Sequence, residues 1–555
     1  MNTLSKLKAY LERDSKAVEP PKSDFKKSSE AIPAPIKKSS YKAAEIALKP
    51  ISIPGLAKEL FPFQNIGVSF LEYRKGRAII GDEPGLGKTA QALAYLQLHP
   101  ELRPAYIICP ASLKYNWAKE VFKWMEKRDE NQLYILSGKK KKTVEEVSIK
   151  SNGRLVLTPC KMPDNGIFII NYDIVANEEI ILVDSEGNPI LKKDKIQYVS
   201  VKNTGWYDQL FNLEAEIVIT DEAQLLANDK ALRTKYVSML AKDSPKFIAL
   251  TGGLIENRPL EAFNVINLVD PSIFPSKWNY QHRYCGAKHN GFGWSFNGAS
   301  NTKELHEKLK GICIRRKKED VLPDLPPKIR TVVPIELNNR SEYETAERNL
   351  IEWIRATKGN KKAEKAANSE ALVRINEMKQ LCAKGKMEGV LNWIADYLSN
   401  DQKLVVFTTH TWVLDAIFEK FKKCSVKVNG KVTGAKRDKA VELFQNDPKI
   451  TLFVGDLKAA GVGLTLTAAY ATATIELGWN ASQHNQAEDR VHRIGQSNDF
   501  VNAYYLLARN TIEEELADMI DVKRKVVNQV LDGDFDFPDD LSLLNGLLQN
   551  MEEIK

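Results

Sequence analysis

Two arginines near the carboxyl end of the chain have the spacing of phosphate-binding residues. They occur in the string Gln-Ala-Glu-Asp-Arg-Val-His-Arg-Ile-Gly-Gln, residues 486–496, where Arg490 and Arg493 are three positions apart. Side chains at that spacing share one face of a helix or tight turn. A guanidinium is always charged, and its rigid fork of donors matches phosphate oxygens. The pair predicts arginine fingers that complete a nucleotide site across a cleft, although a lone pair of this kind also fits a solvated helix end.

A phosphate-binding loop is predicted near the amino end. A short apolar run is followed by a turn with Gly85 and Gly87, then by Lys88, Thr89 and a helix-forming stretch. The glycines let the backbone curl so that its N–H groups and the helix N-terminus face the phosphates. Lys88 is then expected to reach the β- and γ-phosphates of ATP, and the Thr89 hydroxyl to ligate Mg²⁺. The strict pattern has glycine where this chain has Asp82.

A pair of acids supplies the remaining chemistry. Asp221 and Glu222 directly follow the apolar run 217–219. At the carboxyl edge of a parallel sheet, where ligands bind, Asp221 would hold the Mg²⁺. Glu222 would position the attacking water and take its proton. Taken alone, the pair could equally be a surface turn.

The elements that must position these groups alternate in type along the chain. From about 55 to 265, short apolar strands alternate with helical stretches, which predicts a mostly parallel sheet. A second such lobe begins near 403–407 and leads to the arginine block. Residues 1–45 are rich in Lys, Ser and Pro and are expected to be disordered.

Together the three blocks resemble the Swi/Snf-type helicase-like ATPases of superfamily 2, over most of residues 56–530. Further blocks that resemble the family's motifs, in the family's order, are 60–68, 110–113, 171–173, 250–258, 315–321, 325–328, 461–466 and 479–480. The second-lobe blocks are most similar to the annealing-helicase (HARP-like) subgroup. The resemblance implies an α/β fold of two RecA-like parallel-sheet lobes with helical protrusions.

The expected organisation has five parts. They are a disordered basic tail at 1–45, an ATP-binding lobe at 46–269, helical protrusions and linker at 270–385, a second lobe with a brace helix at 386–531, and an acidic tail at 532–555.

The resemblance also assigns residues to ligands. For the nucleotide it adds Gln64, on the adenine base, and Gln486 to Gly85, Gly87, Lys88 and Thr89. For the DNA backbone it implies Ser112, Lys458, Gly463, Thr465 and Trp479. It implies ATP with Mg²⁺, and double-stranded DNA bound through its phosphates, which is a sequence-independent and salt-sensitive contact.

Three functions stay open, and departures from the family pattern bear on one of them, the weakly coupled clamp. The family usually has Met at Pro84, His at Gln224, and Thr-Pro at Gly253 and Leu254; the missing hydroxyl at 253 bears on how hydrolysis couples to movement. An ATP-dependent duplex translocase is favoured by Trp479-Asn480 and the protrusions, which resemble the duplex-tracking branch. The alternatives are a strand-separating DNA or RNA helicase and an ATP-gated DNA clamp with weak coupling.

Composition sets broader limits. A chain of 555 residues with 43% hydrophobic residues can build several cores, and a net charge of +8 suits a polyanionic partner. Six scattered cysteines without a Cys-x-x-Cys argue against a zinc ribbon or disulfide framework and for a reducing compartment. No apolar stretch approaches a membrane span, and residues 1–6 lack a signal core. We therefore expect no membrane contact and a cytoplasmic location, or a nuclear one if the source is eukaryotic. The compact core favours a bacterial or phage-host cytosol over a nucleus.

Overall fold

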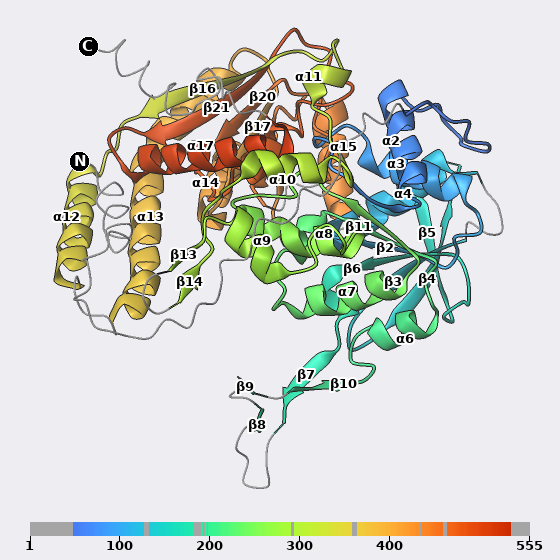
Figure 1. The fold of residues 1–555 in the computed structure, drawn as a ribbon. Helices are drawn as coiled ribbons and strands as arrows, with labels where there is room; N and C mark the ends of the chain where they lie inside the picture. Colours follow the sequence, from blue (N-terminus) through green and yellow to red (C-terminus); the bar gives the residue numbers. More distant parts are fainter. Residues whose placement is uncertain are drawn as a thin grey trace, which may run out of the picture.

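The protein folds into two α/β lobes that face each other, the first at the lower right of Figure 1 and the second at the top. The computed structural model describes residues 48–126, 132–151, 153–182, 190–192, 195–196, 198–289, 293–357, 363–432, 435–458 and 463–533. The expected tail at 1–45, nearly all of the tail at 532–555, and residues 461–462 of the second-lobe motif lie outside the described residues.

The first lobe is built on a nine-stranded sheet in the order β15-β1-β12-β11-β2-β6-β3-β4-β5. Its strands are β1 (Arg77–Ile80), β2 (Ala105–Cys109), β3 (Leu133–Ser137), β4 (Thr143–Ile149), β5 (Leu155–Cys160), β6 (Ile167–Asn171), β11 (Ile217–Asp221), β12 (Lys246–Leu250) and β15 (Cys313–Ile314). Neighbours are parallel from β15 to β3, and β4 and β5 pair antiparallel. The central strands are buried along their whole length, as continuous apolar runs require when both faces are covered.

Helices cover both faces of this sheet and form two cores. One face packs against α2 (Pro62–Tyr73), α3 (Lys88–Leu98) and α4 (Lys114–Trp124). The other packs against α5 (Tyr172–Val175), α6 (Tyr207–Asn212), α7 (Leu232–Asp243), α8 (Phe263–Val269), α9 (Lys277–Tyr284) and α10 (Thr302–Leu309). Shorter elements are η1 (Ala111–Leu113), η3 (Ala223–Leu226), η4 (Pro259–Ala262), α11 (Lys318–Val321) and the strand pairs β7 (Glu178–Ile181) with β10 (Tyr198–Val201), β8 (Leu191–Lys192) with β9 (Lys195–Ile196), and β13 (Lys288–His289) with β14 (Trp294–Ser295).

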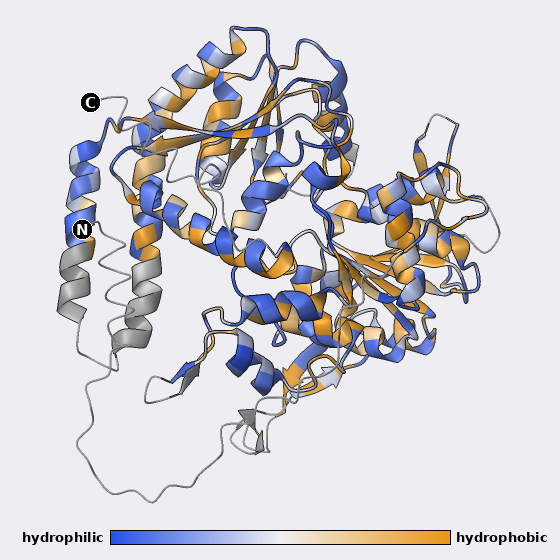
Figure 2. Cartoon of the chain, turned by 45° about the horizontal axis from the view of Figure 1, so that its top comes forward, coloured by the Kyte–Doolittle hydropathy of each residue, from blue (hydrophilic) through white to orange (hydrophobic). Residues whose placement is uncertain are grey.

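The second lobe has a six-stranded, fully parallel sheet in the order β16-β21-β20-β17-β19-β18. Its strands are β16 (Lys328–Ile335), β17 (Leu404–Thr408), β18 (Ser425–Val428), β19 (Leu452–Asp456), β20 (Ala471–Thr474) and β21 (Val501–Ala508). Its helices are α12 (Arg340–Thr357), α13 (Ala363–Leu398), α14 (Thr411–Lys420), α15 (Ala435–Asn446), α16 (Ala481–Glu488) and α17 (Ile512–Leu531). Figure 2 shows hydrophobic residues concentrated on the strands and on the helix faces turned toward them.

The predicted fold class, two parallel-sheet lobes with helical protrusions, is confirmed. The boundary of the second lobe differs from the expected ranges. β16, from the segment expected to hold protrusions and linker, pairs with β21 over its whole length, and α13 runs across the expected boundary at 385 and 386. α17 contacts α10 of the first lobe as well as α13 and α16 of the second, so it joins the lobes as a brace. Within the described residues, no helix is long and apolar enough to cross a membrane.

Candidate active site

The predicted phosphate loop lies between β1 and α3. Gly85 and Gly87 have φ values of 95° and 77°, in the left-handed region that favours glycine. The Lys88 amine folds back over the loop and donates to the carbonyl oxygens of Asp82 (2.8 Å) and Glu83 (3.3 Å). A Cβ built at Gly252 would lie 3.4 Å from that amine, so a side chain there would crowd it. The loop therefore forms a curled cradle around Lys88.

The departure at Asp82 has a structural reason. Its carboxylate is completely buried and accepts hydrogen bonds from Nε of Arg316 (2.8 Å) and from Gln91 (2.9 Å). Arg316 belongs to the basic block 315–321, and its guanidinium lies 5.4 Å from the centre of the Phe63 ring. The buried ion pair thus links the loop to the last strand of the lobe, and part of the basic block serves the nucleotide site.

Gln64 also contacts the phosphate loop. Its side chain is buried; it donates to the Leu86 carbonyl (3.1 Å) and accepts from the Phe61 backbone N–H (3.1 Å). The structure therefore places Gln64 beside the loop, as a nucleotide-binding residue must be. Its role in reading adenine stays a prediction.

The two acids lie at the carboxyl end of β11, next to the loop. Asp221 accepts hydrogen bonds from the indole of Trp117 (2.8 Å) and the Glu222 backbone N–H (3.0 Å). Burial, with the neighbouring Glu222 carboxylate, raises the pKa of Asp221 to about 6. Burial lowers the pKa of the Lys88 amine, while Glu222, Asp82 and Asp221 oppose that shift. Lys88 and the acids therefore share one electrostatic environment.

Glu222 is connected to the block at 250–258 by a chain of hydrogen bonds. Gln224 donates to the Glu222 carboxylate (2.7 Å), and the Thr251 hydroxyl donates to Gln224 (2.6 Å). The Gly253 backbone N–H in turn donates to Thr251 (3.1 Å). Gln224, where the family usually has His, is thus the link between Glu222 and this block.

The arginine block approaches the loop from the second lobe. Arg493 donates to the Leu464 carbonyl (2.9 Å) and the Thr465 hydroxyl (3.0 Å), and Arg490 donates to the Gln486 carbonyl (2.8 Å). A Cβ built at Gly85 would lie 3.1 Å from Cβ of Arg493, so the two lobes nearly touch here. Burial lowers the pKa of both arginines, that of Arg493 to about 10 with help from the charge of Arg490. The structure therefore brings the predicted finger residues to the phosphate loop.

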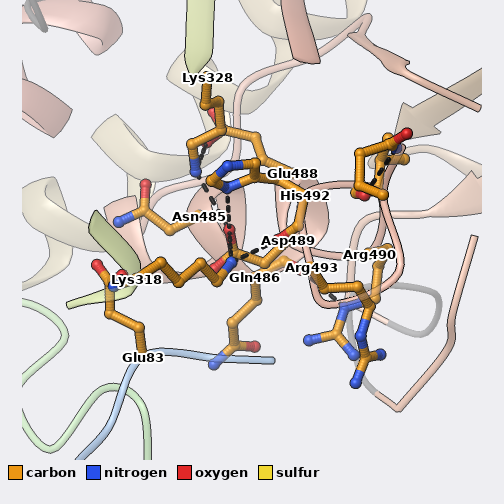
Figure 3. Close-up of polar contacts among 12 residues, drawn as sticks. Glu83, Lys318, Lys328, Asn485, Gln486, Glu488, Asp489, Arg490, His492 and Arg493 are labelled. Atoms are coloured by element: carbon orange, nitrogen blue, oxygen red, sulfur yellow. Dashed lines mark hydrogen bonds and ion pairs between the residues drawn. The ribbon is translucent and has the colours of Figure 1, made fainter. Parts of the chain in front are cut away.

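The acids in the same block are neutralised by other cations (Figure 3). Glu488 pairs with Arg330 (2.7 Å) and Lys328 (2.8 Å), and Asp489 pairs with Lys318 (2.7 Å) and Lys328 (3.2 Å). Among the described residues, neither Arg490 nor Arg493 has a carboxylate within ion-pair distance. Because the neighbouring acids pair with other cations, the two arginines can pair with an anion such as a phosphate.

Lys318 joins this cluster to the first lobe. Its amine also donates to the His492 carbonyl (2.6 Å), and its backbone N–H donates to the Glu83 side chain in the phosphate loop (2.8 Å). The sequence analysis included the basic block but did not predict its contact with the arginine block. The one available signal was that the same chain contains a basic block and an Asp-Arg pair. Lys318 lines a cavity of about 720 Å³ between the lobes, together with Pro84, Gly252, Ser482 and Gln486.

The departures at 253 and 254 lie where the lobes meet. A Cβ built at Gly253 would lie 2.7 Å from the Ser482 hydroxyl oxygen, so glycine permits the close approach of α16. Leu254 is buried in the core of the first lobe. Nearby, Asn480 donates to Glu256 across the cleft (3.2 Å). Burial, with the charges of Glu261 and Glu222, raises the pKa of Glu256 to about 7.

The residues expected to contact DNA come from both lobes. Ser112, Lys458 and Thr465 are exposed. A Cβ built at Gly463 would lie 2.0 Å from the Leu113 side chain, so the block at 110–113 touches the second-lobe motif. Trp479 is 36% exposed, the Lys379 amine lies 4.9 Å from its ring centre, and Lys523 donates to its carbonyl (2.8 Å). Their DNA contacts stay predictions.

The donor set fits Mg²⁺ and a nucleoside triphosphate. Thr89, at the start of α3, and Asp221 would hold the ion, since a hydroxyl and a carboxylate are oxygen ligands that Mg²⁺ accepts alongside phosphates. The described part of the chain has no group of three or more His, Cys, Asp or Glu able to bind a metal alone.

Two parallel-sheet lobes with a phosphate loop and acids on one, and paired arginines on the other, define a helicase-like ATPase. Comparison with protein families agrees. The SNF2-related domain matches residues 63–387, and the helicase conserved C-terminal domain matches residues 386–495. The chain belongs to the SNF2-related family.

Several curated proteins are similar. The DNA annealing helicase and endonuclease ZRANB3 of Bos taurus is 31% identical over 486 residues, which are 86% of this chain and 41% of that protein. The SWI/SNF-related matrix-associated actin-dependent regulator of chromatin subfamily A-like protein 1 of Xenopus tropicalis is 30% identical over 485 residues, 85% of this chain and 45% of that protein. The chain thus spans less than half the length of these relatives.

Among solved structures, the Sulfolobus solfataricus SWI2/SNF2 ATPase core in complex with dsDNA is similar. It is 22% identical and has a TM-score of 0.39, with coverage of 91% of this chain and 98% of that one.

Proposed function

We propose that the protein is an ATP-dependent translocase on double-stranded DNA, and that it hydrolyses ATP in the cleft between its lobes. One observation carries this proposal. Lys88, Asp221 and Glu222 of the first lobe meet Arg490 and Arg493 of the second at the phosphate loop.

In this mechanism the residues mainly position the reactants and balance charge. Lys88 binds the β- and γ-phosphates, and Glu222, oriented by Gln224, holds the attacking water and accepts its proton. Arg490 and Arg493 stabilise the charge that develops on the transferred phosphoryl group. Mg²⁺ bound by Thr89 and Asp221 would neutralise phosphate charge. Since the arginines belong to the second lobe, turnover depends on the closed arrangement of the lobes.

Duplex DNA is the proposed track. The residues that the resemblance assigns to DNA belong to both lobes, and the blocks around Leu113 and Gly463 touch. A duplex bound across that junction would favour closure and thereby stimulate hydrolysis. The names of the relatives, which include DNA annealing helicases, support DNA as the partner. We further propose a cytosolic location, since the six cysteines are unpaired.

Steady-state ATP hydrolysis tests the proposal, measured without nucleic acid and then with blunt duplex DNA, single-stranded DNA and RNA, at low and moderate salt. Stimulation by duplex that fades with added salt is expected. Equal stimulation by single strands, with unwinding of a tailed duplex, would favour the strand-separating helicase. Nucleotide-dependent DNA binding without stimulated hydrolysis would favour the clamp.

A further inference from the structure

One surface of the first lobe exposes aromatic side chains that the ATP site does not use. It is formed by α9 and the β13–β14 pair, which lie beside each other in Figure 1. Trp278 is 54% exposed and Trp294 is 46% exposed. Their rings meet edge to face, with centres 6.4 Å apart. We call Trp278, His282, Trp294 and Phe296 the aromatic platform.

The aromatic platform is held in place by contacts of its own. The His282 ring lies between the two tryptophans, with centres 4.0 Å from Trp278 and 4.4 Å from Trp294, and its Nδ1 lies 2.9 Å from the Trp278 carbonyl oxygen. Phe296 packs 5.0 Å from His282. On the inner side of α9, the buried Tyr280 donates to the Pro259 carbonyl (2.7 Å). The exposed rings are therefore preorganised, which lowers the entropic cost of binding.

The charge around the platform suits a polyanion. Residues 271–303 include no Asp or Glu, although the chain has 72 acids. The same segment includes Lys277, His282, Arg283, Lys288, His289 and Lys303. Lys277 and Arg283 are paired with acids from other segments, whereas Lys288 is exposed at the start of β13. Aromatic faces next to basic residues are the combination that binds single-stranded nucleic acid.

The platform is continuous with the cleft where DNA is proposed to bind. Asn297, next to Phe296, accepts a hydrogen bond from Arg258 of the block at 250–258. Glu256, in the same block as Arg258, accepts a hydrogen bond (3.2 Å) from Asn480, the residue that follows Trp479. Lys523 donates to the carbonyl of Trp479. Polar and cationic groups thus connect the platform to Trp479.

We propose that the aromatic platform stacks the unpaired bases of a DNA strand that leaves the duplex held in the cleft. The inference rests on the proposed function for the duplex itself. Unpaired bases are the fitting occupant because the base faces of a duplex are covered by their neighbours, whereas those of a single strand are open to a tryptophan ring. Such stacking tolerates any base, in keeping with sequence-independent backbone contacts.

The test compares the affinity of the protein for a blunt DNA duplex with that for the same duplex carrying a single-stranded tail that contains 2-aminopurine. Wild-type protein should bind the tailed duplex about tenfold or more tightly and quench the 2-aminopurine fluorescence by stacking. The double variant Trp278→Ala/Trp294→Ala should lose both effects, yet keep its affinity for the blunt duplex and its hydrolysis stimulated by it. Lys288→Gln should weaken only the contribution of the tail and lower its salt dependence.

Tyr198→Ala is the matched control, since Tyr198 is also 54% exposed but lies on the β7–β10 ribbon; it should behave as wild type. A tail advantage that survives in the double variant would overturn the inference. Equal loss of blunt-duplex binding in that variant would also overturn it, because the platform would then be a duplex contact. If blunt duplex fails to stimulate wild-type hydrolysis, the proposed function fails, which is a separate result from the tail measurement.

Discussion

The two halves of the ATP site are held in different ways. In the first lobe each functional group is fixed by its own lobe: Asp221 by Trp117, and Glu222 by Gln224. In the second lobe, Arg490 and Arg493 contact carbonyl and hydroxyl oxygens, while the acids beside them are occupied by Lys318, Lys328 and Arg330. The groups of the first half are positioned by their own lobe, whereas the arginines of the second half would gain a charged partner only when the lobes meet around a phosphate. We therefore expect hydrolysis to depend on closure of the lobes.

Removing the first half should have the largest effect. Lys88→Ala deletes the amine at the centre of the loop and is expected to abolish ATP hydrolysis, while DNA affinity stays close to wild type. Hydrolysis and DNA binding measured on the same preparation provide the check. Loss of both together would show that the loop also supports the DNA surface.

Removing an arginine should separate catalysis from binding. Arg493→Ala is expected to lower kcat by about 10³-fold or more, the usual effect of an arginine finger, with a much smaller change in ATP affinity. Single-turnover hydrolysis and equilibrium nucleotide binding measure the two quantities. Equal losses in both would indicate that Arg493 binds ATP in the ground state.

The contact between the halves can be weakened without touching the nucleotide-binding residues. Lys318→Met removes a buried ion-pair partner of Asp489, so we expect about a 10- to 100-fold fall in kcat, in line with the cost of misplacing catalytic groups, and some loss of thermal stability. Lys317→Met, one residue earlier and more exposed, is the control. If Lys318→Met lowers Tm but leaves kcat unchanged, Lys318 serves stability alone.

A finer test addresses the orientation of Glu222. Gln224→Leu breaks the hydrogen bonds from Glu222 to Thr251 and should lower kcat about tenfold with unchanged ATP affinity, because the water would be less well positioned. Gln224→His, which carries the residue more usual in the family, should retain most of the activity. If the Leu and His variants are equally active, Gln224 does not orient Glu222 for catalysis.

The smallest effect concerns Glu256, which touches Asn480 across the cleft. Its pKa of about 7 exceeds the ordinary value of 4.5, so the folded state favours the protonated form. The resulting contribution of Glu256 to the stability of the folded state is complete below pH 4.5 and is lost as the pH rises through 7. In the wild type, loss of this contribution should lower the free energy of unfolding between pH 5.5 and 7.5. Glu256→Gln should make that decrease about 2 kcal/mol smaller. Denaturant titrations should show no such change for the exposed Glu319→Gln.

Local patterns made much of the first half predictable. The strand, glycines and Lys-Thr of the loop, and the acids that follow β11, are adjacent in sequence to the elements that hold them. The parallel sheets were likewise predictable from continuous apolar strands such as β2 and β6.

Contacts between distant segments were not predictable in the same way. The partner of Asp82 is Arg316, more than two hundred residues away, and that of Lys318 is Asp489 in the other lobe. Nothing in their local sequence specifies these pairs, because register and lobe docking bring them together. For the same reason, the sequence did not predict that β16 joins the second-lobe sheet.

The most direct test of the account is the ratio of ATP hydrolysis with and without blunt duplex DNA, measured in wild type and in Arg493→Ala. If DNA acts by closing the lobes so that the arginines reach the phosphates, duplex should strongly stimulate the wild type and have almost no effect on the variant. A variant that is slow but stimulated by the same factor would contradict the account, since DNA would then act without the second half of the site.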